Sequence, residues 1–206
     1  GSGIMQQLYL RTHGDRGAAG QANLLATDSP TYVVGFDTVI VGSLAPALGG
    51  RLADIQAPVY ILGAALQTNL IVDDSGDTTG RTATLSDSYL NGLAPASIQF
   101  SYYNGFPLKS LTIYGGSGND TFNILSTAPG TTTLVDTGRG GDVIQVGDNR
   151  VLAGINGPLH LQSATSFSGV DLFLDDYLET APKPQVVLND GSVTGLAPAT
   201  ISWTSS

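Results

Sequence analysis

A nine-residue motif rich in glycine and aspartate offers the clearest candidate chemistry in the sequence. The stretch GGSGNDTFN, residues 115–123, fits the pattern G-G-x-G-x-D-x-U-x, in which U is a large apolar residue. In tandem arrays this pattern builds a stacked β-structure that binds calcium. A calcium ion here would use Asp120 and nearby carbonyl oxygens, because Ca²⁺ prefers oxygen ligands.

The absence of an adjacent second copy supports a structural interpretation of the motif. The next related stretch begins only at Thr137 and is degraded, since this threonine replaces its first glycine. In the structural alternative the glycines supply positive φ angles for a tight turn and Asp120 accepts hydrogen bonds from nearby backbone amides. Phe122 and Ile124 would then fill the core. The sequence leaves both interpretations open and favours the structural one.

A second calcium candidate is the stretch DDSGDTTG, residues 73–80. Asp73, Ser75 and Asp77 alternate like the first ligands of a calcium-binding loop, but threonines replace the glycine and the bidentate glutamate that complete it. A polar loop with Asx turns is the alternative. The candidate metal ligands are thus Asp73, Ser75, Asp77 and Asp120. Ca²⁺ is a candidate ligand, and no cofactor is required.

The residues that could support catalysis are sparse. The only histidines, His13 and His160, have no partner at a metal-binding spacing, and His160 lies in an alternating strand that should point it toward solvent. The adjacent pairs Asp73–Asp74 and Asp175–Asp176 could serve a glycosidase. However, adjacent residues of a strand point to opposite faces of the sheet. We therefore expect no enzymatic activity and no catalytic residues.

Composition excludes several other classes of function. Of 206 residues, 41% are hydrophobic and only 12% are charged, and the net charge is −9. Nucleic acid and anionic membrane surfaces require clustered basic residues, so we expect neither as a partner. The chain has no cysteine, and neither a membrane span nor a signal peptide is evident.

The chain consists of two copies of one unit. GLAPASI (92–98) and GLAPATI (195–201) lie 103 residues apart, as do LYL (8–10) and LTI (111–113). Intervening pairs are separated by 100 to 105 residues and occur in the same order. We expect units at 1–103 and 104–206 that stack as one continuous domain.

Short alternating apolar segments between turn residues predict an all-β fold. The 22-residue spacing between residues 116–124 and 138–146 suggests a parallel β-helix, or β-solenoid, with coils of about 22 residues. A pair of tandem immunoglobulin-like β-sandwiches is the alternative.

The two ends of the sequence suggest an assembly interface. The repeat continues in phase if the last residue is followed by the first, and both terminal segments are largely uncharged and partly apolar. We expect head-to-tail contacts between copies; a segment of one longer array would show the same phase. The aromatic residues Phe100, Tyr102, Tyr103 and Phe106 near the repeat junction could stack on sugars or cap an end of the solenoid, but packing between the units is the favoured interpretation. The expected interface residues are Ile4, Met5, Leu8, Leu10, Ile201 and Trp203.

The stretches GGSGNDTFNI, VDDSGDTTGR, GLAPA and DIQAPVYI together resemble the tandem β-solenoid repeats of large secreted bacterial surface proteins of planctomycete type. The nonapeptide alone resembles the calcium-binding repeats of haemolysin-type proteins. The resemblance implies an extracellular or cell-surface location in bacteria. It also implies a structural role as a filament that associates with itself. A glycan-binding adhesin or a polysaccharide-acting β-helix enzyme is the alternative, with a surface glycan as partner.

Overall fold

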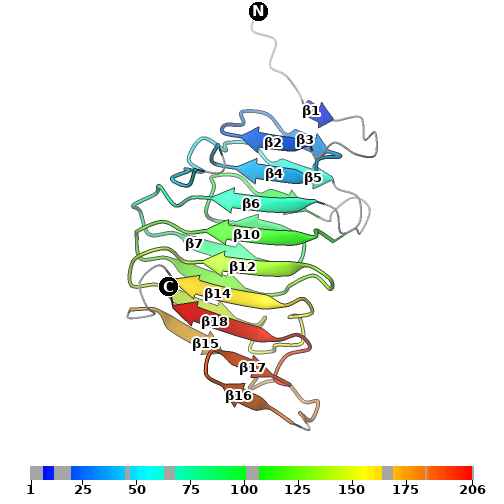
Figure 1. Cartoon of the computed structure of the whole chain (residues 1–206), viewed down its shortest axis with the longest axis vertical. Helices are drawn as coiled ribbons and strands as arrows, with labels where there is room; N and C mark the ends of the chain where they lie inside the picture. The colour runs from blue at the N-terminus through cyan, green and yellow to red at the C-terminus, as the bar shows by residue number, and fades with distance from the viewer. Residues whose placement is uncertain are drawn as a thin grey trace, which may run out of the picture.

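The computed structural model describes residues 7–11, 20–44, 47–62, 68–100, 107–163, 169–183 and 185–205. These residues form strands and turns, with no helix, and the strands make two nine-stranded sheets in an elongated stack (Figure 1). The prediction of an all-β fold is therefore confirmed. No helix in the described part of the chain is long and apolar enough to cross a membrane.

Each sheet is a continuous row of hydrogen-bonded strands. From one end of the row to the other, sheet A contains β1 (Leu8–Arg11), β3 (Thr31–Val34), β5 (Val59–Leu62), β9 (Ile98–Phe100), β8 (Tyr89–Asn91), β7 (Thr82–Leu85), β11 (Thr121–Ile124), β13 (Val143–Val146) and β15 (Asp171–Leu174). In the same direction, sheet B contains β2 (Gln21–Leu24), β4 (Thr38–Val41), β6 (Asn69–Asp73), β10 (Ser110–Tyr114), β12 (Thr132–Asp136), β14 (Leu159–Ser163), β18 (Ile201–Ser205), β17 (Ser192–Thr194) and β16 (Val187–Asn189).

Parallel pairing dominates both sheets. Among the strands of the described residues, only the pairings made by β8 and β17 are antiparallel. Parallel neighbours need a long crossover connection, and here most crossovers run through the opposite sheet, because the chain alternates between the sheets from β1 to β7 and from β10 to β15. Immunoglobulin-like sandwiches have antiparallel sheets, so the pairing disfavours that alternative.

The expected 22-residue spacing holds for only part of the stack. It is met where Leu111 pairs with Thr133 and where Phe122 pairs with Ile144. Longer separations occur in the first unit, where Thr31 pairs with Val59 and Val39 pairs with Leu70. The spacing varies because the turns lie on the surface, where their length is less constrained than that of the strands.

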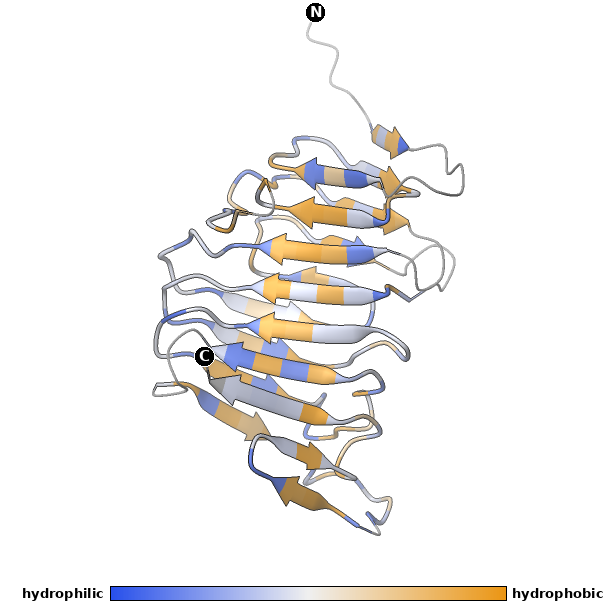
Figure 2. Ribbon diagram, in the orientation of Figure 1, coloured by the Kyte–Doolittle hydropathy of each residue, from blue (hydrophilic) through white to orange (hydrophobic). Residues whose placement is uncertain are grey.

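The core lies between the two sheets and runs through both repeat units. In β11, Phe122 and Ile124 are buried while Thr121 and Asn123 are half-buried, as the period-two alternation of a strand requires. The strands in the middle of the stack carry apolar residues at such alternate positions (Figure 2). Each layer of strands thus covers the apolar residues of its neighbours.

The 103-residue repeat of the sequence reappears in the strand pairing. In the first unit Thr84 pairs with Asn91, and in the second Val187 pairs with Thr194. The strands β1–β9 therefore have counterparts in β10–β18. Counterparts lie in opposite sheets: the first unit places six strands in sheet A and three in sheet B, and the second unit does the reverse.

Candidate functional site

The nonapeptide forms the turn from β10 to β11, and Asp120 lies buried at its end. The Asp120 carboxylate accepts hydrogen bonds from the backbone N–H of Arg81 at 2.7 Å and of Gly116 at 3.3 Å. In the next layer, Asp142 accepts a hydrogen bond from the backbone N–H of Asp120 at 2.9 Å. These aspartates therefore satisfy the amides of neighbouring turns, as the structural interpretation predicts.

The expected role of the glycines in this turn is wrong. Gly115, Gly116 and Gly118 do not have positive φ angles. They are required because the backbone of a neighbouring turn lies against them. A Cβ at Gly116 would overlap the carbonyl oxygen of Asp77, and one at Gly118 would overlap the backbone at Gly80.

Replacing Gly116 by alanine should lower the free energy of unfolding by about 2 kcal/mol, because the overlapping atom is backbone that cannot move aside alone. Gly141→Ala is the matched control, since a Cβ there would have no atom closer than 3.7 Å. Equilibrium denaturation of both variants measures the difference. Equal stability of the two variants would contradict the close-packing explanation.

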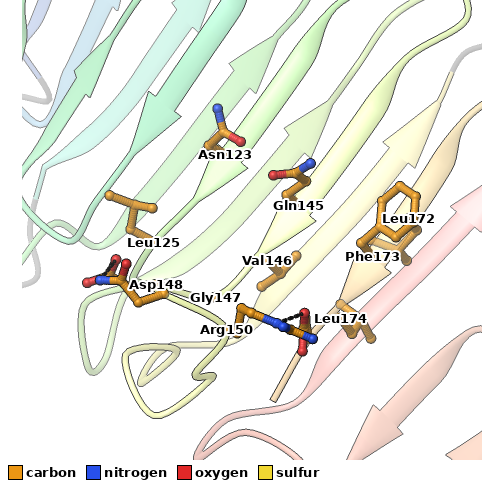
Figure 3. Close-up of a pocket in the computed structure, with 12 residues that line it drawn as sticks. Asn123, Leu125, Gln145, Val146, Gly147, Asp148, Arg150, Leu172, Phe173 and Leu174 are labelled. Carbon is orange, nitrogen blue, oxygen red and sulfur yellow. Dashed lines mark hydrogen bonds and ion pairs between the residues drawn. The ribbon is translucent and has the colours of Figure 1, made fainter. Parts of the chain in front are cut away.

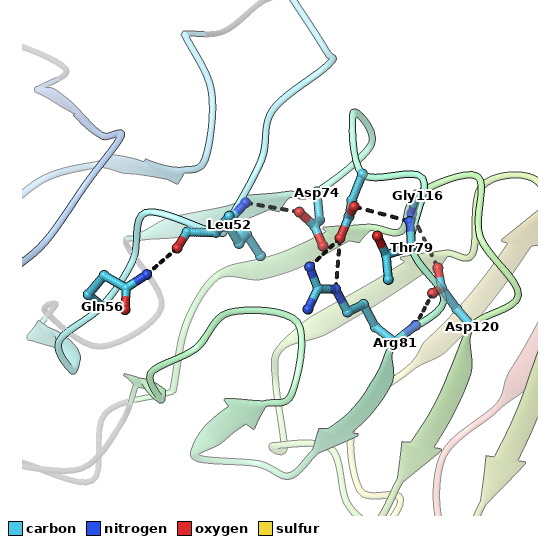
Figure 4. Close-up of polar contacts among 9 residues, drawn as sticks. Leu52, Gln56, Asp74, Thr79, Arg81, Gly116 and Asp120 are labelled. Atoms are coloured by element: carbon cyan, nitrogen blue, oxygen red, sulfur yellow. Dashed lines mark hydrogen bonds and ion pairs between the residues drawn. The ribbon is translucent and has the colours of Figure 1, made fainter.

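The second candidate calcium loop is held by hydrogen bonds within the protein (Figure 4). The Asp73 Oδ1 atom accepts hydrogen bonds from the backbone N–H and the hydroxyl of Ser75, at 3.0 and 2.5 Å, which is an Asx turn. Asp77 accepts a hydrogen bond from Arg81 Nε at 2.7 Å and forms an ion pair with the same guanidinium. Burial alone would raise the pKa of Asp77, but the hydrogen bonds from Arg81 and Thr79, together with the Arg81 charge, outweigh it and lower that pKa below its ordinary value.

The carboxylates among the four predicted calcium ligands thus accept hydrogen bonds from protein groups. Within the described ranges, no three Asp, Glu, His or Cys side chains are grouped in a way that could hold a metal ion. Calcium binding stays a prediction, which a thermal melt with and without Ca²⁺ would test.

Sequence reasoning missed the most perturbed group of this region, Asp74. Its Oδ1 atom accepts a hydrogen bond from the Leu52 backbone N–H at 2.9 Å, whereas Oδ2 is buried with no hydrogen-bond partner in the described structure. Burial is the main cause that raises the pKa of Asp74 from 3.8 to about 6, and the nearby charges of Asp77 and Asp120 add to it. The doubled aspartate was the only signal in the sequence. Asp176 occupies the equivalent place in the second unit, where it accepts from Leu152 and pairs with Lys183.

The other predicted residues have plain structural roles. His160 is half-buried on sheet B, where its ring nitrogens lie 3.0 Å from Ser202 Oγ and 3.1 Å from Thr204 Oγ1. Phe100 is buried in the core on β9, which pairs with β5 and β8. The remaining aromatic residues of that group, together with Ile4, Met5 and His13, lie outside the described residues.

The structure places Ile201 and Trp203, which were expected at the assembly interface, inside sheet B rather than at an end of the stack. Both residues belong to β18, which pairs with β14 on one side and β17 on the other. The antiparallel segment β16–β17–β18 turns the chain back, so that β16 and not β18 is the outermost strand. A signal for this turn existed, because Asp190-Gly191 is a typical hairpin sequence.

Leu8 and Leu10, by contrast, lie on an outermost strand. β1 ends sheet A and β2 ends sheet B at one end of the stack, while β15 and β16 end the same sheets at the other. Leu8 and Leu10 are exposed on β1. Val186, just before β16, and Leu188 within it are also exposed.

A pocket of about 790 Å³ lies on the outer face of sheet A, near β15 (Figure 3). Asn123, Gln145 and Phe173 are register partners on three successive strands and form its floor. The ring of Phe173 is 53% exposed. No hydrogen bond joins the side chains of Asn123 and Gln145 to other groups in the described structure.

One wall of this pocket is a two-residue turn, Asn149-Arg150, with φ angles of 48° and 64°. Left-handed angles at two consecutive residues define a type I′ turn, which usually has glycine at its second position. Arg150 replaces that glycine. Its Nε atom donates to Asp175 at 2.7 Å, and its guanidinium lies 4.4 Å from the centre of the Tyr177 ring.

Comparison with known proteins adds no relative to this description: the chain matches no protein-family model, no curated protein and no solved structure. The fold and the sites define it as an all-β protein of two sheets rich in parallel pairing.

Proposed function

We propose that the protein is a β-solenoid that serves as a structural module of an extracellular or cell-surface bacterial fibre. In this proposal a second copy of the chain stacks on it head to tail. The observation that carries the proposal is the internal junction between the two repeat units, because its two sides have counterparts at the two ends of the stack.

The internal junction consists of two parallel pairings, one in each sheet. In sheet B, β6 pairs with β10, so that Leu70 lies beside Leu111 and Val72 beside Ile113. In sheet A, β7 pairs with β11, so that Ala83 lies beside Phe122 and Leu85 beside Ile124. All of these residues are buried. A junction between units can therefore be as dry and continuous as the interior of one unit.

Because the two units are repeats of each other, the internal junction predicts which strands would meet in a contact between two copies of the chain. By the repeat, β15 and β16 correspond to β6 and β7, and β1 and β2 correspond to β10 and β11. The outer strands of the same sheet therefore match: β15 would pair with β1 of the next copy in sheet A, and β16 with β2 in sheet B. A contact between two different surfaces propagates into a filament.

The same correspondence gives the register of the contact. Leu172 would lie beside Leu8 of the next copy and Leu174 beside Leu10. In sheet B, Val186 would lie beside Ala22 and Leu188 beside Leu24. Leu188 is 72% exposed although its counterpart Leu85 is buried, so stacking would remove an exposed apolar surface from water.

Aromatic stacking supports the same register. Tyr9, Tyr32 and Tyr60 form a column on sheet A, with ring centroids 4.7 and 4.6 Å apart. At the internal junction Ile71 pairs with Thr112. Because Ile71 corresponds to Phe173 and Thr112 corresponds to Tyr9, Phe173 would lie next to Tyr9 of the following copy. The column would then continue across the contact.

Pairs of cysteines introduced into this cysteine-free chain test the register directly. Asn23→Cys with Val187→Cys should give a ladder of covalent multimers on oxidation, because neighbouring parallel strands bring Cα atoms within about 4.4–6.8 Å. Gln21→Cys with Gln185→Cys should do the same. Gln21→Cys with Val187→Cys should not, since a two-residue shift adds about 6.6 Å along the strand. Non-reducing gel electrophoresis is the measurement.

Equal cross-linking of the matched and shifted pairs, or the absence of multimers from both matched pairs, would contradict the proposal. A second variant tests the apolar contact: Leu188→Lys should prevent elongated assemblies seen by light scattering, because a lysine blocks an edge strand. Leu48→Lys, which replaces another exposed leucine in a lateral loop, should leave them intact.

A further inference from the structure

We propose that the pocket on the outer face of sheet A binds a neutral oligosaccharide through Asn123, Gln145 and Phe173. This inference goes beyond the proposed stacking of copies, because it concerns the lateral face of the stack, although Phe173 takes part in both.

The first unit provides an internal comparison for this site. The counterparts of Asn123, Gln145 and Phe173 are Asn23, Ile40 and Ile71. Ile40 is buried, whereas Gln145 is exposed. The stack can therefore be built with aliphatic residues at two of these positions, and the second unit instead presents an amide and an aromatic ring to solvent.

The wall of the pocket is also specific to the second unit. The segment from Gly147 to Leu152 is five residues shorter than the corresponding segment from Gly42 to Leu52, and it contains the type I′ turn. Left-handed angles at non-glycine residues are strained and persist where surrounding contacts hold them. Here the contacts are those of Arg150 with Asp175 and Tyr177. This turn fixes a rigid wall beside the floor.

The chemistry of the floor selects the class of ligand. A side-chain amide offers both donors and acceptors, which match the hydroxyl groups of a sugar. An exposed aromatic ring offers an apolar face against which the C–H face of a pyranose ring can pack. Both kinds of group follow one another on adjacent strands, about 4.8 Å apart, so that an extended chain of sugar rings would meet them in turn.

The charges around the pocket disfavour an anionic ligand. Arg150 is neutralised by Asp175 at 2.7 Å, which leaves Asp148 as an additional negative charge. The hydrogen bond from the Tyr177 N–H, followed by that from Arg150, lowers the pKa of Asp175 below its ordinary value, so the pair is ionised at neutral pH. The net charge of the whole chain is also −9. Nucleic acids and acidic polysaccharides would be repelled.

Titration with cellohexaose, chitohexaose and maltohexaose tests the site, with binding followed by calorimetry or by NMR shifts. The protein used should carry Leu188→Lys, so that assembly and binding are measured separately. We expect saturable binding of at least one of the three sugars below about 10 mM, weakened at least tenfold by Phe173→Ala and by Gln145→Ala. Asn23→Ala, which alters the counterpart of Asn123 in the first unit, should leave binding unchanged.

Two results would overturn this proposal: no saturable binding of any of the three sugars, or binding that Phe173→Ala and Gln145→Ala leave intact in folded protein. Both side chains are exposed, so thermal melts of the variants should match that of the parent. The cysteine cross-linking described above does not depend on the pocket, so either proposal can fail alone.

Discussion

The difference in free energy of unfolding between Asp74→Asn and the unsubstituted protein should increase by about 3 kcal/mol in favour of the variant between pH 4 and pH 8. Asp74 is 2% exposed, and the pKa of its carboxyl is raised from 3.8 to about 6, mainly by burial. A raised pKa means that the folded state holds its proton where the unfolded state has lost it. The stabilising contribution of the Asp74 carboxyl to the free energy of unfolding is therefore fully present below about pH 4 and is lost as the pH rises to about 6.

The magnitude follows from this shift at about 1.4 kcal/mol per pKa unit. Asparagine keeps the acceptor for the Leu52 N–H but carries no charge, so its contribution does not change with pH. Urea denaturation of both proteins across the pH range measures the difference. Comparing the two proteins cancels the contributions of the other carboxyl groups.

Asp176→Asn is the matched control for this prediction. Asp176 accepts the equivalent hydrogen bond from the Leu152 N–H at 2.8 Å, but its second oxygen lies 3.3 Å from Lys183 Nζ. The asparagine variant removes this ion pair with Lys183 and should therefore lose stability rather than gain it. If the difference in free energy of unfolding between Asp74→Asn and the parent protein did not change with pH, burial would not destabilise the ionised Asp74 carboxylate as expected.

Phe122→Ala should lower the free energy of unfolding by about 3–5 kcal/mol, the largest loss expected from any single truncation here. Phe122 is 1% exposed and packs between the sheets at the centre of the stack. Alanine would leave a cavity that the close backbone of neighbouring turns cannot fill by collapsing. Equilibrium denaturation at a fixed pH measures the loss.

Phe173→Ala provides the comparison, because that ring is 53% exposed on an outermost strand. Its removal should change stability by no more than about 0.5 kcal/mol. A loss below about 1 kcal/mol for Phe122→Ala would mean that the layers around β11 can close the cavity, and that the core is less rigid than the contacts indicate.

The 103-residue repeat is visible in the sequence itself, and part of the strand pairing follows it. The 103-residue offset relates the pairing of Thr84 with Asn91 to that of Val187 with Thr194. The exchange of sheets between the units was not predictable in the same way. Alternation along a strand shows which side faces the core but not which of two similar sheets the strand joins.

The candidate sites were harder to predict, because they depend on neighbours far apart in the sequence. The environment of Asp74 comes from Leu52, Asp77 and Asp120, and only stacking brings these together. The pocket depends on the register of Asn123, Gln145 and Phe173 across three strands. The glycines of the nonapeptide were expected to supply positive φ angles, and only the structure shows that they permit close backbone contact instead.

The unequal division of each unit between the sheets has a mechanical consequence. With strands about 4.8 Å apart, one unit is about 14 Å taller on one side than on the other, so it has the shape of a wedge. The second unit is a wedge of opposite taper, and the pair forms a block of nine strands on both sides, about 43 Å tall, with nearly parallel ends. A fibre made from such pairs can grow straight, with an axial period of two units, whereas an odd number of units would leave a tilted end.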